Sequence, residues 1–152
     1  MKQFQRNLII LLLIFLSLGA LFGGVALIIS PSGELIQMPV SMLEPSPFND
    51  FLIPGIILFI VFGVFPLIIS YALLYKPKSK IANLLNIFSD MHWAWTYTIY
   101  IGFGIIIWIQ MQMVFIDDVH WAHTTYVFWG IAILLLALLP KVRGMYKKAS
   151  LV

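Results

Sequence analysis

The chain has 152 residues, of which 62% are hydrophobic and 10% are charged. A typical soluble domain carries about 25% charged residues, and a water-soluble core of this size could not hide so much apolar surface. The composition therefore excludes a soluble globular protein and indicates an integral membrane protein. The net charge of +3 comes without a basic, aromatic-rich segment outside the apolar runs, so we expect no nucleic-acid partner.

Four apolar runs are long enough to cross a bilayer as helices, and none contains Asp, Glu, Lys or Arg. A helix needs about 20 residues to span the ~30 Å hydrocarbon layer. The alternation of apolar and polar positions typical of transmembrane β-strands is missing from these runs. We therefore predict one all-α membrane domain, residues 1–152, folded as an up-down four-helix transmembrane bundle. The predicted helices cover residues 8–29, 51–75, 93–116 and 122–140.

The first run follows a charged start, as a signal peptide would. It continues past Ser17 to Ile29 and lacks an Ala-x-Ala site, so we expect an uncleaved anchor. Gly19 and Gly23 form a GxxxG pattern, which lets a second helix approach closely. Three interpretations of this pattern stay open: packing within the chain, dimerisation of two chains, or neither.

The loop of residues 30–50 is rich in apolar side chains, so we predict that it folds back as a lid over the end of the bundle. In the second run, Asp50 is expected to cap the start of the helix. Pro54 then falls in the first turn, where proline is tolerated. Pro66 lies in the middle of the run and predicts a kink near Phe62.

Basic residues surround the two other segments outside the predicted spans. Residues 76–80 are rich in lysine and precede residues 81–88, where Asn83 and Asn86 are spaced three apart among apolar residues. This spacing predicts a short amphipathic helix in the membrane interface. The basic tail, residues 141–148, is expected to dock on anionic lipid headgroups.

The charges separate into two groups along the chain. All nine basic residues lie near the termini or between the second and third runs, whereas five of the six acidic residues lie in the other two connections. Cytoplasmic loops of membrane proteins are enriched in Lys and Arg. We therefore expect both termini and all the basic segments on the cytoplasmic side, where the partner would be the anionic surface of the lipid bilayer.

The chain contains no cysteine, which excludes disulfides, thiolate metal ligands and thiol redox chemistry. His92 precedes the third run, while His120 and His123 lie at the start of the fourth. At ~1.5 Å per helical residue the two levels are about 35 Å apart. One haem cannot be ligated from both levels within a subunit, and we assign no cofactor.

A cluster of carboxylates and imidazoles lies between the third and fourth runs, at Asp117, Asp118, His120 and His123. Such groups could hold a divalent ion such as zinc. That hypothesis predicts metal in the purified protein, lost when both histidines become alanine. The spacing matches no established metal motif, however. Under the other interpretation the acidic residues complement a helix start and Trp121 anchors it in the interface.

Ionisable residues are missing from the predicted spans apart from His123 at one edge, which disfavours ion-coupled transport, because coupling needs a group that binds and releases charge. No predicted helix carries a catalytic Ser/His pair or a carboxylate pair, and no glycine-rich phosphate loop follows a strand. Gln110 and Gln112 near the end of the third run either contact the lid, line a polar vestibule, or are satisfied near the headgroups.

A series of glycines and prolines runs from the first span into the second, and an aromatic motif lies in the third. The residues are Gly23-Gly24, Pro31-Ser32-Gly33, Pro39, Leu43, Ser46-Pro47-Phe48, Asp50-Phe51-Leu52-Ile53-Pro54-Gly55, and Trp108-Ile109 with Gln112. This pattern resembles a family of small, uncharacterised bacterial membrane proteins with four spans. The resemblance implies a bacterial inner-membrane location and assigns no functional residue.

Three functions remain as hypotheses. The first is a non-enzymatic accessory protein that docks a membrane-protein partner, a second copy or a lipid through its helix faces and loop. The second is a small oligomeric transporter or channel for an uncharged or hydrophobic solute. The third is a metal-dependent enzyme built on the Asp/His cluster, which no catalytic motif supports.

Overall fold

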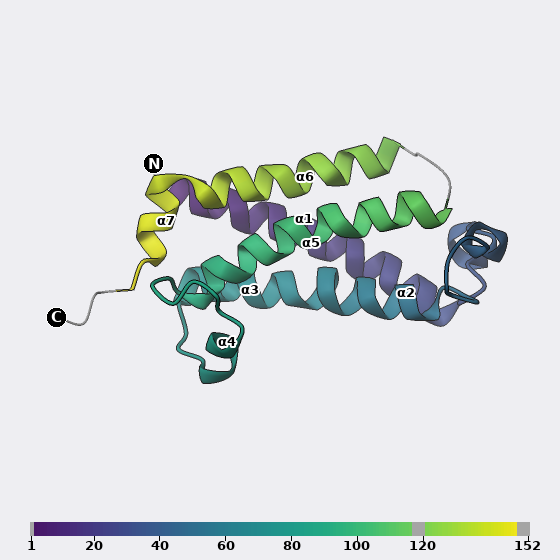
Figure 1. Ribbon diagram of the computed structural model, residues 1–152, viewed down its shortest axis with the longest axis horizontal. Coiled ribbons are helices and arrows are strands. Elements are labelled where there is room, and N and C mark those ends of the chain that lie inside the picture. Colours follow the sequence, from purple (N-terminus) through teal and green to yellow (C-terminus); the bar gives the residue numbers. More distant parts are fainter. Residues whose placement is uncertain (1, 117–120, 149–152) are drawn as a thin grey trace.

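The computed structural model describes residues 2–116 and 121–148. Within them, four helical stretches are long and apolar enough to cross a membrane. They are α1 (Lys2–Ile29), the consecutive segments α2 (Leu52–Ile57), η3 (Leu58–Val64) and α3 (Phe65–Tyr75), then α5 (Trp93–Ile116) and α6 (Trp121–Leu138). Figure 1 shows these stretches side by side with alternating direction. The predicted all-α four-helix bundle is confirmed, and the chain is a multi-pass membrane protein.

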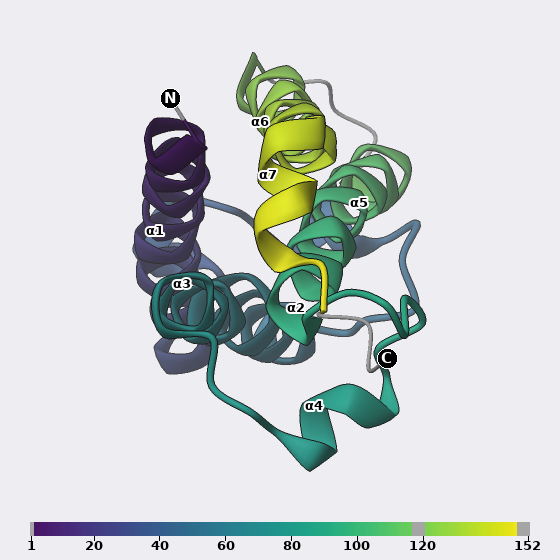
Figure 2. The same ribbon diagram turned by 90° about the vertical axis from the view of Figure 1, so that its left-hand side faces the viewer.

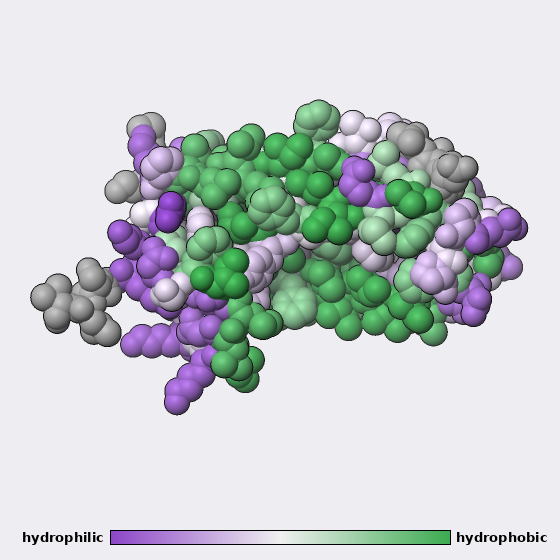
Figure 3. Space-filling model, in the orientation of Figure 1, coloured by the Kyte–Doolittle hydropathy of each residue, from purple (hydrophilic) through white to green (hydrophobic). Residues whose placement is uncertain are grey.

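The surface of the bundle is divided into three zones along its length. Apolar residues cover the middle, and hydrophilic residues gather at both ends (Figure 3). One end, here named the basic end, carries α7 (Pro140–Tyr146) and the lysines around Lys76 and Lys148. The opposite end, here named the loop end, carries the loop of residues 30–51. An apolar band between polar ends is the arrangement that a bilayer imposes, because hydrocarbon cannot solvate charge.

Glycines set the distances within two pairs of helices. An added Cβ on Gly24 of α1 would lie 2.8 Å from the backbone nitrogen of Phe59 in the second span. An added Cβ on Gly130 of α6 would lie 2.9 Å from the carbonyl oxygen of Gly102 in α5. Close backbone approach of this kind provides the packing contacts that hold helices together in lipid. The bundle therefore consists of α1 packed on the second span, and α5 packed on α6.

The two pairs are joined in the half of the bundle nearer the basic end. The indole of Trp129 in α6 donates to the carbonyl of Leu12 in α1 (3.0 Å). The hydroxyl of Tyr146 in α7 donates to the carbonyl of Leu73 in α3 (2.7 Å). Burial raises the pKa of Tyr146 to about 12, so the phenol stays protonated and keeps this hydrogen bond at physiological pH.

The second span is a continuous rod whose central part is a π-helix, Leu58–Val64. The N–H of Phe65 reaches back five residues to the carbonyl of Ile60. Pro66 has no N–H to donate. The wider π-helical turn just before it accommodates the hydrogen bond that the helix lacks at this proline. Figure 1 draws α2, η3 and α3 as one nearly straight helix, so the kink predicted near Phe62 is replaced by a π-helical segment.

The loop at the loop end is folded onto the bundle, as predicted for a lid. It contains two short 3₁₀ helices, η1 (Glu34–Ile36) and η2 (Val40–Leu43). Gly33 has φ of 76° and turns the chain so that its carbonyl accepts from Met38. Leu43 and Phe51 are buried against Leu27 of α1. The carboxylate of Asp50 accepts from the N–H of Leu52 (2.9 Å), as expected of a cap.

The basic end differs from expectation in two segments. The interfacial helix α4 runs only from Lys80 to Leu84, shorter than the predicted 81–88, and Ser79 caps it. Figure 2 shows α4 projecting from the bundle and α7 lying across its end. The basic tail forms α7, whose Val142 and Tyr146 are buried against the bundle, while its basic side chains are exposed. Its docking on anionic headgroups stays a prediction.

Candidate functional site

The half of the bundle nearer the basic end is filled by side chains. Leu13, Ile133 and Ala137 have no exposed surface. The indole N–H of Trp95 donates to the carbonyl of Ala137 across the helix pair (2.8 Å). This half has a closely packed apolar core, as is usual for a protein interior.

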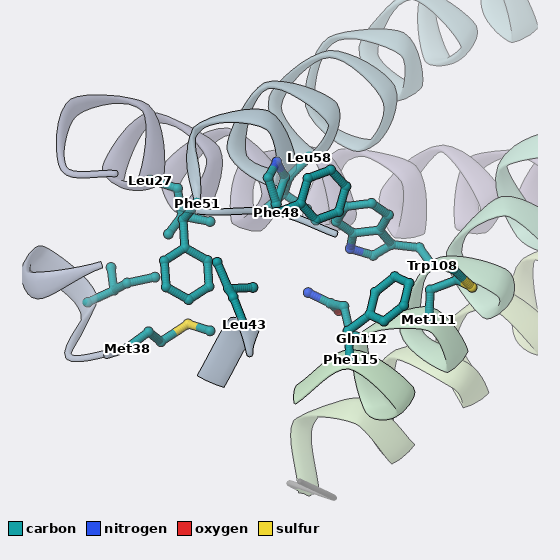
Figure 4. A pocket seen from close by; sticks show the side chains of 13 residues that line it. Leu27, Met38, Leu43, Phe48, Phe51, Leu58, Trp108, Met111, Gln112 and Phe115 are labelled. Carbon is teal, nitrogen blue, oxygen red and sulfur yellow. The ribbon is translucent and has the colours of Figure 1, made fainter. Parts of the chain in front are cut away.

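The half nearer the loop end contains a cavity of about 250 Å³ between the second span, α5 and the loop. Its walls are apolar, with four aromatic rings and two methionines (Figure 4). The residues that line it are Gly23, Leu27, Ile36, Met38, Leu43, Phe48, Phe51, Pro54, Leu58, Trp108, Met111, Gln112 and Phe115.

A second cavity of about 230 Å³ lies on the far side of the same wall, between α1, α5 and α6. Four residues line both cavities and form the wall between them, namely Met38, Leu58, Trp108 and Gln112. The remaining residues around the second cavity are Leu16, Gly19, Ala20, Ile105, Ile109, Ala122, His123 and Tyr126. The two cavities thus form one region under the loop.

A surface groove lies next to the second cavity. A groove between α1 and α6 shares Leu16, Ala122 and Tyr126 with it. Two exposed aromatic residues, Phe15 and Trp121, flank the groove. The rim of the groove is therefore apolar, and it faces the surface of the bundle between α1 and α6.

The GxxxG glycines lie on the walls of these cavities. An added Cβ on Gly19 would lie 3.2 Å from the hydroxyl of Tyr126, and one on Gly23 would lie 3.4 Å from a methyl of Leu58. The closest backbone approach of α1 to another helix is made by Gly24 instead. An added Cβ on Gly19 would crowd Tyr126, whereas one on Gly23 would only touch Leu58, so Gly23 is the position that leaves room beside α1.

One polar group in this region lacks a partner. The indole nitrogen of Trp108 is buried and makes no hydrogen bond to the residues that the structure describes. The ring is held by Phe62 of the π-helix, at 5.9 Å between ring centroids. Figure 4 shows the indole nitrogen and the amide of Gln112 on the same side of α5, facing the cavity beside Leu43. Leaving a buried donor unpaired costs about 1–3 kcal/mol. A ligand that brings a hydrogen-bond acceptor to the indole N–H would therefore be stabilised here.

The cavity walls are uncharged. Among the described residues that line either cavity, none is Asp, Glu, Lys or Arg, and His123 is the one titratable imidazole. The loop carboxylates Glu34, Glu44 and Asp50 are exposed to the surroundings instead. An ionic ligand group would therefore meet no opposite charge inside.

The Asp/His cluster falls mostly outside the described residues. Asp117, Asp118 and His120 lie there, and only His123 is placed, on the wall of the second cavity. Within residues 2–116 and 121–148, no group of three or more His, Cys, Asp or Glu could hold a metal ion. The metal hypothesis for the whole cluster stays a prediction.

The role of Trp108 was not predicted from the sequence. In the sequence, Trp108 and Gln112 stand out only as members of the pattern that resembles other four-span membrane proteins. Of the three interpretations for Gln112, the structure places its side chain in the cavity wall, whereas Gln110 is exposed.

Comparison with known proteins gives no match to a family model, to a curated protein or to a solved structure.

Proposed function

We propose that the protein is a non-catalytic lipid-binding protein of the bacterial inner membrane, which holds the apolar part of a lipid in the cavities beneath its loop. The observation that carries this proposal is the apolar cavity region beneath the loop, next to a groove between α1 and α6 with an apolar rim. An unfilled apolar cavity forfeits packing contacts, and lipid is the apolar material that surrounds the bundle at this level.

The orientation follows from the charges. Lys78, Lys80 and Arg143 are exposed at the basic end, and basic segments favour the cytoplasmic side. The loop end and its cavities then belong to the outer leaflet. The exposed apolar side chains of Ile81 and Leu84 on α4 suit insertion into the inner interface beside anionic headgroups.

A role in binding agrees with the chemistry of the site. The cavity walls are apolar and uncharged, and they contain no paired carboxylates and no Ser/His pair among their described residues. A solute path through one chain is disfavoured by the filled half around Leu13 and Ile133. A membrane-protein partner or a second copy that receives or presents the lipid remains part of this proposal.

The proposal is tested by photochemical cross-linking in nanodiscs of phosphatidylglycerol that carries a diazirine on one acyl chain. We expect adducts on cavity residues such as Leu43 and Phe115. Gly23→Leu should remove most of them, because the added Cβ fits beside Leu58 and the rest of the side chain enters the cavity.

Gly104→Leu is the matched control. Gly104 lies in α5 outside both cavities, and an added Cβ there makes an ordinary contact, 3.5 Å from Phe62. This variant should keep the wild-type adducts. Labelling spread evenly over the lipid-facing surface, or unchanged by Gly23→Leu, would contradict the proposal.

A further inference from the structure

We propose that the lipid held in the cavities is a quinone whose ring carbonyl accepts a hydrogen bond from the indole N–H of Trp108. This inference rests on the proposed lipid-binding function and specifies the ligand. It follows from four properties of the site: the unpaired donor, the uncharged walls, the depth in the membrane, and the aromatic lining.

The donor requires an acceptor on the ligand. The Trp108 indole is a donor only, and it is buried without a partner among the described residues. The amide of Gln112 lies beside it on the same wall and offers N–H groups as well. A ligand that brings carbonyl oxygens to this wall satisfies both groups.

The acceptor is uncharged. Neither cavity has a Lys or Arg among its described lining residues, and burying an anion without a counter-charge is far more costly than burying a carbonyl. Phosphate and carboxylate headgroups are thereby disfavoured at this position, whereas neutral carbonyl groups are accepted.

The depth of Trp108 in the membrane distinguishes between the lipids that could supply this carbonyl group. Helix α5 has 24 residues, and Trp108 precedes its last residue, Ile116, by about 12 Å at ~1.5 Å per residue. With α5 centred on a ~30 Å hydrocarbon layer, the indole lies about 9 Å inside that layer. The ester carbonyls of phospholipids lie at its boundary. A quinone ring carries its carbonyl groups on a neutral ring and can enter to this depth.

The shape and walls suit a planar ring. Aromatic side chains from the loop and from α5 surround the first cavity, including Phe48, Phe51 and Phe115, and aromatic rings gain from stacked or edge-on contacts. An apolar cavity of about 150 Å³ can hold benzene, so 250 Å³ is large enough for a substituted quinone ring.

The test measures how well two ligands with the same tail, decylbenzoquinone and decylbenzene, prevent cross-linking of the diazirine lipid in wild-type protein. We expect the quinone to compete about 3- to 10-fold better, the range of one or two neutral hydrogen bonds. Trp108→Phe should remove most of this preference while leaving competition by decylbenzene unchanged, which also reports that the variant is folded.

Gln112→Leu provides a second variant, and it should reduce the preference for the quinone by a smaller factor. Equal competition by the two ligands in wild-type protein would overturn the quinone inference and leave the lipid site standing. A preference that persists in both variants would overturn the assignment of the hydrogen bond. If the diazirine lipid fails to label the cavity at all, the proposed lipid-binding function fails first.

Discussion

The hydroxyl of Ser17 in α1 donates a hydrogen bond to the carbonyl oxygen of Gly63 in the π-helix of the second span. Both residues are buried. This bond fixes the position of α1 along the second span near the middle of the bundle, next to the face of α1 that lines the cavities. The bond therefore connects the π-helical segment of the second span to the helix α1 that lines the cavities.

Ser17→Ala is expected to lower the free energy of unfolding by about 0.6–1.7 kcal/mol, the range for hydrogen bonds between membrane helices. Reversible unfolding in mixed micelles measures this change. Ser70→Ala is the control, because the Ser70 hydroxyl donates to Pro66 within its own helix and joins no helices. A cost for Ser17→Ala no larger than that for Ser70→Ala would contradict the role assigned to the bond.

The two neighbouring glycines of α1 should respond differently to an added methyl group. Gly24→Ala places a Cβ 2.8 Å from the backbone of Phe59, which cannot move without separating the helices, so we expect a loss of about 1–3 kcal/mol. Gly23→Ala meets only a flexible Leu58 methyl at 3.4 Å and should be nearly neutral. Unfolding in mixed micelles compares the two variants, and equal costs would show that the cavity wall is as tightly packed as the helix contact.

His92 predicts a pH dependence at the basic end. Burial lowers the pKa of His92 from its ordinary value of 6.5, and the charges of Lys76 and Lys148 act in the same direction. The neutral ring accepts from the N–H of Ala94 at Nδ1 and contacts the carbonyl of Pro77 through Nε2. Protonation at Nδ1 would remove the first of these bonds.

Because the folded state binds this proton less readily than the unfolded state, the stability contributed by neutral His92 is complete above pH 6.5 and is lost as the pH falls below that value. Thermal unfolding at pH 8 and pH 5.5 measures the effect. In His92→Gln the decrease between these two pH values should be smaller. A decrease as large as that of the wild type would assign the pH dependence to other groups.

Single cysteines test the orientation directly, because the natural chain has none. Ser32→Cys lies at the loop end and Ser89→Cys at the basic end, and both positions are exposed. In intact bacterial cells a membrane-impermeant maleimide should label position 32 at once and position 89 only after the membrane is opened. The reverse pattern would place the cavities in the inner leaflet.

The fold class could be predicted from the sequence because each span is a long run without charge, and a bilayer admits only structures that satisfy their own backbone. The predicted boundaries were less accurate where tertiary contacts extend or end a helix. The helix α4 ends at Leu84. The basic tail packs onto the bundle through Val142 and Tyr146, whereas its positive charge had indicated contact with lipid headgroups.

The site could not be predicted because its residues look ordinary in sequence. The chain has five tryptophans, all near or within apolar runs. Trp93, Trp95 and Trp129 donate to carbonyl groups of other segments, whereas the donor of Trp108 has no partner among the described residues. That difference depends on which residues lie opposite each indole across a helix contact.

The sequence by itself determined the medium and the four spanning helices of this protein, because the hydropathy of each run decides whether hydrocarbon or water surrounds it. Only the tertiary structure decided where the helices separate. The close contacts at Gly24 and at Gly102 with Gly130 hold each pair together, and the bonds near the basic end join the pairs. The space under the loop depends on how well side chains from residues far apart in the chain fill the volume between the helices.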